Sequence, residues 1–311
     1  MKPAPFEYAA VSSVSEAITT LERYGSDARI LAGGQSLMQE MNLRQTRPAY
    51  LIDINPVTEL DYARETPTGL AIGALTRHRT VEHSELIQRV HPVLCEAAKH
   101  IAHFQIRNRG TFGGSLVQNS PGAEYGVVAR LLDAEMVIVG SSGERVVPSE
   151  EFFVSHFQTS VRPGEIVTEV RLPYLPEGSG SAFVEITHRH GHVPIVSAAA
   201  AVALNTDGTV REARVALGNV ANGVPYRARA AERLLGNDLS NDILEDFAQA
   251  VSEEVQPDPE ADRRAAFTEQ QSGILGRRTA EVAGASYRKQ VAGVLSRRAV
   301  EIAAQRTEGG Q

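Results

Sequence analysis

Two short glycine-containing segments carry the residue types that bind phosphate. Residues 33–36 read Gly-Gly-Gln-Ser, and residues 111–115 read Thr-Phe-Gly-Gly-Ser. Glycine has no Cβ, so successive amide groups can converge and a ligand can approach the backbone closely. Converging amides form a concavity that suits anions, and the neighbouring hydroxyl groups can donate further hydrogen bonds. Together the two segments are expected to hold a pyrophosphate from both sides.

Neither segment matches the common nucleotide-binding motifs. The sequence has no G-x-G-x-x-G after an apolar strand and no G-x-x-x-x-G-K-[ST], so a Rossmann dinucleotide site and a P-loop find no support. One Gly-Gly pair by itself is most often a tight turn. Two such pairs, each beside small hydroxyl residues, favour a phosphate-containing ligand, and the turn interpretation stays open at this point.

The bulk composition narrows the function classes. The 311 residues suffice for two domains, and a net charge of -7 argues against nucleic acid as a partner. No apolar run approaches the roughly 20 residues of a membrane span, and the N-terminus does not resemble a secretory signal, so a cytoplasmic location is expected. The single cysteine, Cys95, excludes an internal disulfide. It also excludes an iron–sulfur cluster held by this chain alone, since such clusters usually take four cysteines.

The elements that must position the two segments read as an α+β domain. Ser13 and Glu16 have the spacing of a capping box at the start of a helix. The helical pattern of residues 81–101 is expected to break at Pro92. Apolar strands are expected at residues 29–32, 49–54, 69–74, 134–139, 145–147 and 165–172. The Pro-, Gly- and Ser-rich residues 173–181 then form the best candidate linker.

A smaller α/β domain is expected after this linker. Three strands are predicted, at residues 182–187, 196–204 and 212–217, and the last two are joined by the turn sequence Asn-Thr-Asp-Gly at 205–208. Helices are predicted at residues 227–235, 240–255 and 286–305. The charged residues 258–264 are expected to be exposed.

The surroundings of the glycine pairs resemble a known family. Residues 30–37 (Ile-Leu-Ala-Gly-Gly-Gln-Ser-Leu) and 105–116 (Gln-Ile-Arg-Asn-Arg-Gly-Thr-Phe-Gly-Gly-Ser-Leu) are similar to the two FAD-binding signatures in the medium subunits of molybdenum hydroxylases. This group includes the carbon monoxide dehydrogenase flavoprotein and the FAD segment of xanthine dehydrogenase. Further similar motifs follow in the family's order at residues 51–54, 72–76, 120–124, 132–134, 217–218, 227–229 and 286–289.

The resemblance implies a fold and a set of cofactor contacts. The fold is a bilobed FAD-binding domain of the vanillyl-alcohol oxidase type over residues 1–175, without a Rossmann fold, with lobes at about 1–55 and 56–175. A C-terminal domain of the carbon monoxide dehydrogenase flavoprotein type follows at 176–311. No residue is assigned to catalysis on the organic substrate or to a metal. The implied FAD contacts are Leu31, Ala32, Gly33, Gly34, Gln35, Ser36, Leu37, Gly110, Thr111, Gly113, Gly114, Ser115, Asn119, Glu124, Ile166, Val167 and Val193.

The same resemblance implies an electron-transfer role within a complex. FAD would accept electrons from the [2Fe-2S] clusters of a small partner subunit and pass them to an external acceptor. A large molybdopterin subunit would oxidise the organic substrate, which could be an N-heterocycle, an aldehyde, a purine or carbon monoxide. The implied assembly is a dimer of heterotrimers. Two alternatives stay open: a self-sufficient flavin oxidoreductase of the same fold group, and a nucleotide-binding assembly module without redox activity.

The sequence departs from the family pattern at residues 188–193, which read His-Arg-His-Gly-His-Val. His192 occupies the place of a common aspartate and Val193 the place of a residue that covers the flavin ring, which bears on the electron acceptor. On a strand, His188, His190 and His192 would share one face and could bind a metal, although a polar strand end near the flavin is favoured. Residues 263–282 are also longer than the usual family loop.

Three further side chains have two interpretations each. Cys95 could attach a flavin covalently, but its apolar helical face favours packing in the core. Phe112 and Tyr125 could stack on a flavin ring or pack in the core.

Overall fold

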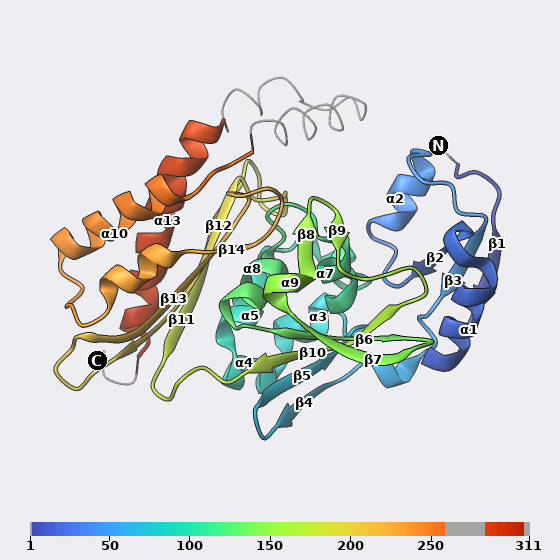
Figure 1. The fold of residues 1–311 in the computed structure, drawn as a ribbon, viewed down its shortest axis with the longest axis horizontal. Coiled ribbons are helices and arrows are strands. Elements are labelled where there is room, and N and C mark those ends of the chain that lie inside the picture. The colour runs from blue at the N-terminus through green and yellow to red at the C-terminus, as the bar shows by residue number, and fades with distance from the viewer. Residues whose placement is uncertain (1, 259–283, 308–311) are drawn as a thin grey trace.

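The computed structural model describes residues 2–258 and 284–307. Three sheets of three, five and four strands follow one another along the chain, with helices between and beside them (Figure 1). The expected charged residues 258–264 and the long loop at 263–282 lie wholly or almost wholly outside the described residues. No helix in the described part of the chain is both long and apolar enough to cross a membrane.

The N-terminal sheet is parallel and leads into the first glycine pair. Its strand order is β1 (Glu7–Ala10), β3 (Tyr50–Asp53), β2 (Ala28–Leu31). Helix α1 (Val14–Tyr24) packs on it, and the Ser13 hydroxyl accepts a hydrogen bond from the Glu16 amide at 3.2 Å. The expected capping box is therefore confirmed at its N-cap, while the Glu16 carboxylate accepts from the amide of Ser12 instead. The glycine pair follows β2 and precedes helix α2 (Leu37–Asn42).

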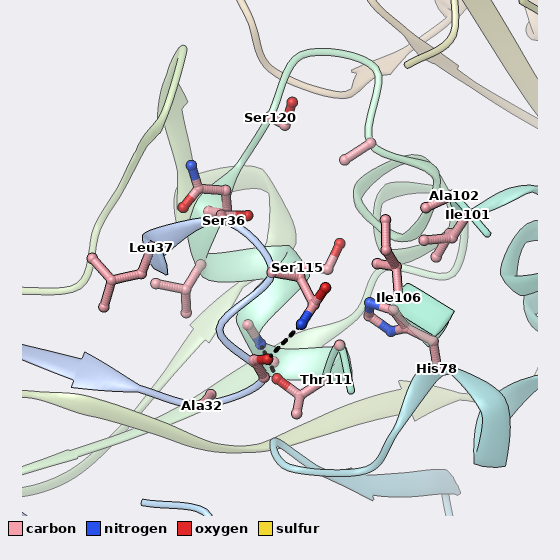
Figure 2. A pocket seen from close by; sticks show the side chains of 18 of the residues that line it. Ala32, Ser36, Leu37, His78, Ile101, Ala102, Ile106, Thr111, Ser115 and Ser120 are labelled. Carbon is pink, nitrogen blue, oxygen red and sulfur yellow. Dashed lines mark hydrogen bonds between the residues drawn. The ribbon is translucent and has the colours of Figure 1, made fainter. Parts of the chain in front are cut away.

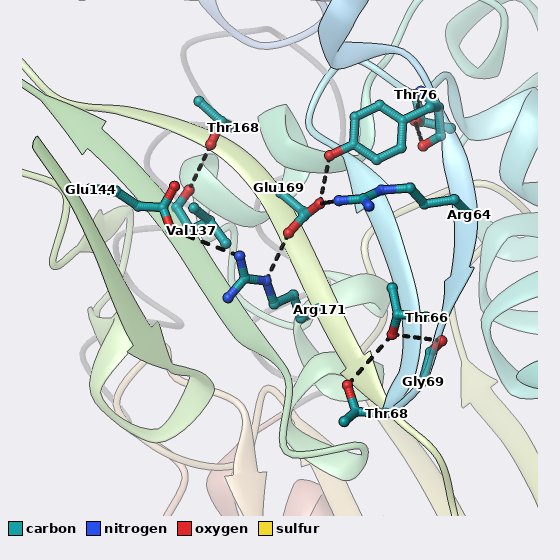
Figure 3. Close-up of polar contacts among 11 residues, drawn as sticks. Arg64, Thr66, Thr68, Gly69, Thr76, Val137, Glu144, Thr168, Glu169 and Arg171 are labelled. Carbon is teal, nitrogen blue, oxygen red and sulfur yellow. Dashed lines mark hydrogen bonds and ion pairs between the residues drawn. The ribbon is translucent and has the colours of Figure 1, made fainter.

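The central sheet is antiparallel and has one apolar and one polar face. Its strand order is β4 (Ala63–Thr66), β5 (Gly69–Gly73), β10 (Ile166–Pro173), β6 (Glu135–Gly140), β7 (Gly143–Pro148). The apolar face contributes to the main core with the helices that cover it. On the opposite face the buried Glu169 accepts hydrogen bonds from Tyr62, Arg64 and Arg171 at 2.6 to 2.7 Å (Figure 3). These contacts connect β10 to β4 and to the residue before it, across the intervening strand β5.

Short helices connect the strands on the apolar side. The expected helix at residues 81–101 is three helices, because the chain breaks at Ser84 as well as at His91, just before Pro92. Pro92 stands at the start of the third helix, where its missing N–H costs no hydrogen bond. These helices are α3 (His78–His83), α4 (Glu85–Val90), α5 (Pro92–His100), α6 (Phe104–Arg107), α7 (Phe112–Gln118), α8 (Glu124–Leu131) and α9 (Ser149–Phe152), and the small hairpin β8 (Phe153–Ser155) and β9 (Gln158–Thr159) follows them.

The C-terminal sheet has four antiparallel strands, not the three expected. The order is β11 (Gly180–Ile186), β12 (Val196–Leu204), β13 (Val210–Gly218), β14 (Tyr226–Arg227). The expectation of a helix at residues 227–235 is wrong for Arg227, which pairs with Ala216 as part of β14. Most of the remaining segment forms the 3-10 helix η3 (Arg229–Leu234). A two-residue strand has too few positions to show a period, so only pairing with β13 defines it.

Both faces of this sheet are covered. Helices α10 (Asn241–Glu254) and α13 (Ala285–Gln305) pack on one face, and α5 and α8 pack on the other (Figure 1). Phe183 and Ala199 belong to the same core as α5 and α8, whereas Ala198 and Ala200 belong to the core beneath α10 and α13. Small alanine side chains along β12 let both helical layers approach closely. The C-terminal sheet therefore shares an extensive apolar interface with the N-terminal part of the chain.

Candidate functional site

The two segments identified from the sequence lie against each other in the structure. A Cβ built on Gly33 would be 2.4 Å from the carbonyl oxygen of Arg109 and 2.7 Å from the Cα of Gly110. No side chain larger than hydrogen fits there unless the backbone moves. Gly34 adopts φ +72°, a left-handed conformation that glycine reaches without steric cost. Glycine is therefore required at both positions, for two different reasons.

The second glycine pair lies in the first turn of helix α7, although the sequence indicated a loop. The Thr111 hydroxyl caps this helix by accepting a hydrogen bond from the Gly114 amide at 3.2 Å. The Gly113 amide donates to the Ala74 carbonyl at 2.9 Å, and a Cβ on Gly113 would be 2.6 Å from that of Ala74. Glycine is a poor helix former, but the cap and the close packing outweigh its low propensity here.

Two polar side chains that the sequence reasoning missed brace these segments. The Arg77 guanidinium donates to the Arg109 carbonyl at 2.6 Å and to the Asn55 side-chain oxygen at 2.7 Å. Asn55 in turn donates to the Ala32 carbonyl at 2.7 Å. This Arg77–Asn55 brace connects the chain before each glycine pair. Its only signal in the sequence is position, because each residue follows shortly after a buried strand.

The amide groups of the first segment are available to a ligand. Within the described ranges, the backbone N–H groups of residues 33–36 donate no hydrogen bond to the protein. The Gln35 side chain donates to the Gly33 carbonyl at 3.0 Å, which fixes the shape of the turn. Because backbone N–H groups are strong donors that rarely stay unpaired, this turn is suited to bind an anion.

A cavity of about 680 Å³ lies between the glycine segments and the rest of the chain. Figure 2 shows Ala32 and Leu37 on one side of it, and His78, Ala102 and Ile106 across from them. A third wall comes from residues 188–194, apart from 189 and 190, in the connection between β11 and β12. The volume falls in the range of about 300–1,000 Å³ that is typical of cofactor sites. The mixture of apolar walls and an anion-binding turn suits a large ligand with a phosphate group.

Two titratable side chains line this cavity and are buried. Glu124, the first residue of α8, is 7% exposed, and burial, followed by the nearby charge of Glu185, raises its pKa to about 8. Burial, followed by the charges of Arg107 and Arg77, lowers the pKa of His78 to about 3. Both side chains are therefore largely neutral at pH 7, which keeps the wall around them uncharged.

The three alternating histidines do not lie on a strand. Residues 188–192 form a turn, so the expectation that His188, His190 and His192 would share one strand face is wrong. His188 and His192 line the cavity, whereas the His190 ring lies 6.5 Å from that of His100. In the described part of the chain, no three His, Cys, Asp or Glu side chains are grouped so that they could hold a metal ion.

All the expected FAD-contacting residues except Leu31 and Asn119 line the cavity. Leu31 ends strand β2. Asn119 is buried at the end of α7, where its side-chain amide donates to the carbonyls of Ser155 and Gln158 at 2.6 and 3.1 Å. Asn119 thus holds the β8–β9 hairpin against α7. The sequence reasoning did not single out the cavity-lining Ile54, His78, Ala102, His103, Ile106 and Ser120 as contacts, and each contact with a cofactor stays a prediction.

The side chains with two interpretations pack in the core. Cys95 is fully buried, its thiol donates to the Val81 carbonyl at 3.1 Å, and burial raises its pKa to about 11. Core packing is therefore confirmed for Cys95. Phe112 and Tyr125 are also fully buried and contact each other edge to face, with ring centroids 4.7 Å apart. The core interpretation holds for both rings, neither of which lines the cavity.

Comparison with known proteins agrees with this geometry. Residues 4–175 match the family described as the FAD binding domain in molybdopterin dehydrogenase, and residues 181–279 match the CO dehydrogenase flavoprotein C-terminal domain. The 6-hydroxypseudooxynicotine dehydrogenase complex subunit alpha of Paenarthrobacter nicotinovorans is 42% identical, over 91% of this chain and 96% of that protein. The carbon monoxide dehydrogenase medium chain of Hydrogenophaga pseudoflava is 35% identical, over 92% and 99%.

Solved structures show the same similarity in three dimensions. A structure of carbon monoxide dehydrogenase from Hydrogenophaga pseudoflava superimposes with a TM-score of 0.87 and 34% identity, covering 99% of this chain and 100% of that one. Both the FAD-binding and the C-terminal domain are therefore present, in a mixed fold of helices and sheets. By sequence and by structure, this chain belongs to the FAD-binding medium subunits of the carbon monoxide dehydrogenase and xanthine dehydrogenase family of molybdenum hydroxylases.

Proposed function

We propose that this chain holds FAD in the cavity and transfers electrons within a molybdenum hydroxylase complex. It would receive them from the [2Fe-2S] clusters of a small partner subunit and pass them to an external acceptor. A large molybdopterin subunit would oxidise the organic substrate. The observation that supports the proposal best is the cradle in which Gly33 lies against Arg109 and Gly110. The amides of residues 33–36, which line the cavity, donate to no protein group among the described residues.

The residues of the cavity fit FAD. The amides of residues 33–36 and the hydroxyls of Ser36 and Ser115 would bind the pyrophosphate, whose charge also favours the N-terminus of α7. Ile166 and Val167 would provide apolar contacts, and Val193 would cover part of the flavin ring. Bound FAD supplies the redox chemistry, exchanging two electrons. The chain itself binds and orients the cofactor and keeps water from it.

Several finer features belong to the same proposal. Because the chain has one cysteine, the iron–sulfur clusters must lie in another subunit. We assign residues 1–175 to a bilobed FAD-binding domain of the vanillyl-alcohol oxidase type, without a Rossmann fold, and residues 176–311 to the C-terminal domain. We further propose assembly as a dimer of heterotrimers in the cytoplasm. The relatives include subunits named for dehydrogenation of carbon monoxide, caffeine and glyceraldehyde, and we propose that the large subunit sets the substrate.

Spectroscopy of the purified chain tests the proposal. The chain should take up FAD and show a flavin absorbance spectrum, and N-heterocycles, aldehydes or purines added to the chain alone should not bleach it. Bleaching should require co-purified partner subunits. Bleaching without partners would contradict the subunit role and favour a self-sufficient flavin oxidoreductase. Failure to take up any FAD would contradict the FAD assignment and favour a nucleotide-binding assembly module.

A further inference from the structure

Polar side chains are buried between the C-terminal sheet and helices α5 and α8. Glu185 of β11 and Ser197 of β12 are paired across the sheet, so both point to the same face as Phe183 and Ala199, the face that packs on these helices. The Glu185 side chain is 3% exposed. In the described part of the chain, Glu185 Oε2 and Ser197 Oγ have no hydrogen-bond partner. Unpaired buried oxygens are costly, so both atoms are free to bind a bridging polar partner.

The buried polar pair Glu185 and Ser197 lies near the cavity on one side. Gly122 lies two residues before Glu124, which lines the cavity. A Cβ built on Gly218 would meet both Ser197 Oγ and, at 3.1 Å, the Gly122 Cα, so Gly218 of β13 packs between Ser197 and the segment that leads to Glu124. Glu124 senses Glu185 electrostatically, because the charge of Glu185 adds to the effect of burial in raising the pKa of Glu124.

The other side of this pair reaches the surface. Glu185 Oε1 lies 3.1 Å from Nδ1 of His100, the last residue of α5, and the His100 side chain is 36% exposed. The His190 ring lies beside His100. Glu96, one turn earlier in α5, is engaged elsewhere, since it accepts from the Phe183 amide and pairs with Arg306. The remaining histidines near the cavity wall are His78, His103, His188 and His192, which line the cavity itself.

We propose that Glu124, Glu185 and His100 form a proton-transfer path that connects the cavity to solvent along this interface. The inference rests on the proposed function, because it needs FAD in the cavity. Two electrons and two protons convert FAD to FADH2, and iron–sulfur clusters of a partner deliver electrons only. Each proton passes from the Glu124 carboxyl into the cavity. His100 then restores the proton on Glu124 through Glu185 and takes up another proton from water.

The chemistry of the three groups suits this role. The pKa of Glu124, about 8, keeps its carboxyl group protonated at pH 7 but lies close enough to that pH for the proton to be released. Acid–base transfer is efficient when the pKa lies near the working pH. Ser197 Oγ and Glu185 Oε2 provide the polar partners that a bridging water needs between the carboxyl groups. The path begins with His100, whose two ring nitrogens let it take a proton from solvent and pass one to Glu185.

The coupling is tested first in the chain without FAD. Infrared spectra follow the protonated carboxyl band of Glu124, which is identified by its loss in Glu124→Gln. Glu185→Gln removes a like charge and should lower the pKa of Glu124, whereas Glu212→Gln on β13 of the same sheet should leave it unchanged. An identical titration curve in Glu185→Gln would show that the carboxyl groups are not coupled and would overturn the path.

Proton uptake is tested next in the FAD-loaded chain. Photoreduction in weak buffer is followed by the flavin absorbance and by a pH-indicator dye. Glu185→Gln and His100→Ala should bind FAD normally but slow proton uptake by about tenfold or more, and added imidazole should restore the rate in His100→Ala. Glu212→Gln should match the wild type.

The outcomes separate the two proposals. Wild-type rates in His100→Ala overturn the path even if Glu185→Gln fails to fold, because His100 lies at the surface. Slow uptake without imidazole rescue also overturns it, since a lost packing contact would then explain the effect. A wild-type chain that shows no flavin spectrum overturns the proposed function instead, and that result is visible before any variant is made.

Discussion

Replacement of Gly33 by alanine tests the cradle most directly. The built Cβ lies 2.4 Å from the Arg109 carbonyl oxygen, and real Cβ atoms essentially never come closer than 3.0 Å to another heavy atom. The two segments must therefore separate by at least about 0.6 Å. The neighbouring atoms are backbone, and the Arg77 guanidinium holds the same carbonyl oxygen, so the strain cannot relax through a flexible side chain.

Overpacking of this kind costs about 1–3 kcal/mol. If the segments separate to relieve it, the amides of residues 33–36 no longer converge on one anion. We therefore expect Gly33→Ala to weaken FAD binding about 10- to 100-fold, equivalent to about 1.4–2.7 kcal/mol. Titration of the FAD-free chain with FAD, followed by flavin fluorescence, measures this change, and circular dichroism checks the fold.

Gly178→Ala is the matched control. Gly178 has φ +75°, and a Cβ there would meet no atom within 4 Å, so alanine strains the backbone without any clash. This strain costs about 1–2 kcal/mol of stability, but Gly178 does not line the cavity, so FAD affinity should not change. A folded Gly33→Ala chain that binds FAD as tightly as the control does would refute the reasoning.

Three further substitutions probe the brace, the buried acid and the exposed sheet face. Arg77→Ala should weaken FAD binding about tenfold, because both glycine segments lose their hydrogen bonds to the brace. Arg89→Ala breaks only an exposed ion pair with Glu65 and should leave FAD affinity unchanged. Equal FAD affinities of these two variants in a fluorescence titration would exclude the role of the brace. Glu124→Gln should stabilise the FAD-free chain by about 4 kcal/mol at pH 8 and hardly at all near pH 4.5. Burial raises the folded-state pKa of Glu124 to about 8, so between pH 4.5 and pH 8 the carboxyl ionises in the unfolded chain but stays protonated in the folded chain, which lowers the free energy of unfolding. Urea unfolding at both pH values measures the difference. A gain in stability of the same size at each pH would contradict the prediction. Glu169→Gln should destabilise the chain by about 1–2 kcal/mol at pH 7, because hydrogen bonds from its neighbours outweigh burial and lower the pKa of Glu169. The loss should disappear at a pH below that lowered pKa, and a loss that persists there in acid unfolding curves would point to packing instead.

The cofactor segments could be recognised because their function depends on local spacing. Glycines beside small hydroxyl residues can form an anion-binding turn without any contact from distant residues. The capping box at Ser13 likewise depends only on residues three positions apart. The turn at residues 205–208 was predicted for the same reason, and Gly208 has φ +86° in the structure. Long periodic helices such as α13 were also predicted to within a residue or two.

The errors occur where distant contacts decide the local structure. Strand β14 exists because Arg227 pairs with Ala216, and α7 is helical because Thr111 caps it and Ala74 packs against Gly113. The histidine segment has the alternation of a strand, but it pairs with no strand in the described part of the chain and forms a turn. In each case the sequence pattern was too short or too ambiguous to outweigh tertiary packing.

The sequence by itself predicted FAD binding through two glycine segments, and its single cysteine predicted that iron–sulfur clusters lie in partner subunits. Tertiary structure alone decided how the site is built. It brings Gly33 against Arg109, joins both segments through Arg77 and Asn55, and buries Glu124 in the wall of the cavity. The physical reason is that backbone conformation and residue type are local properties, whereas close approach, burial and the pKa shifts they cause depend on residues that the fold alone brings together.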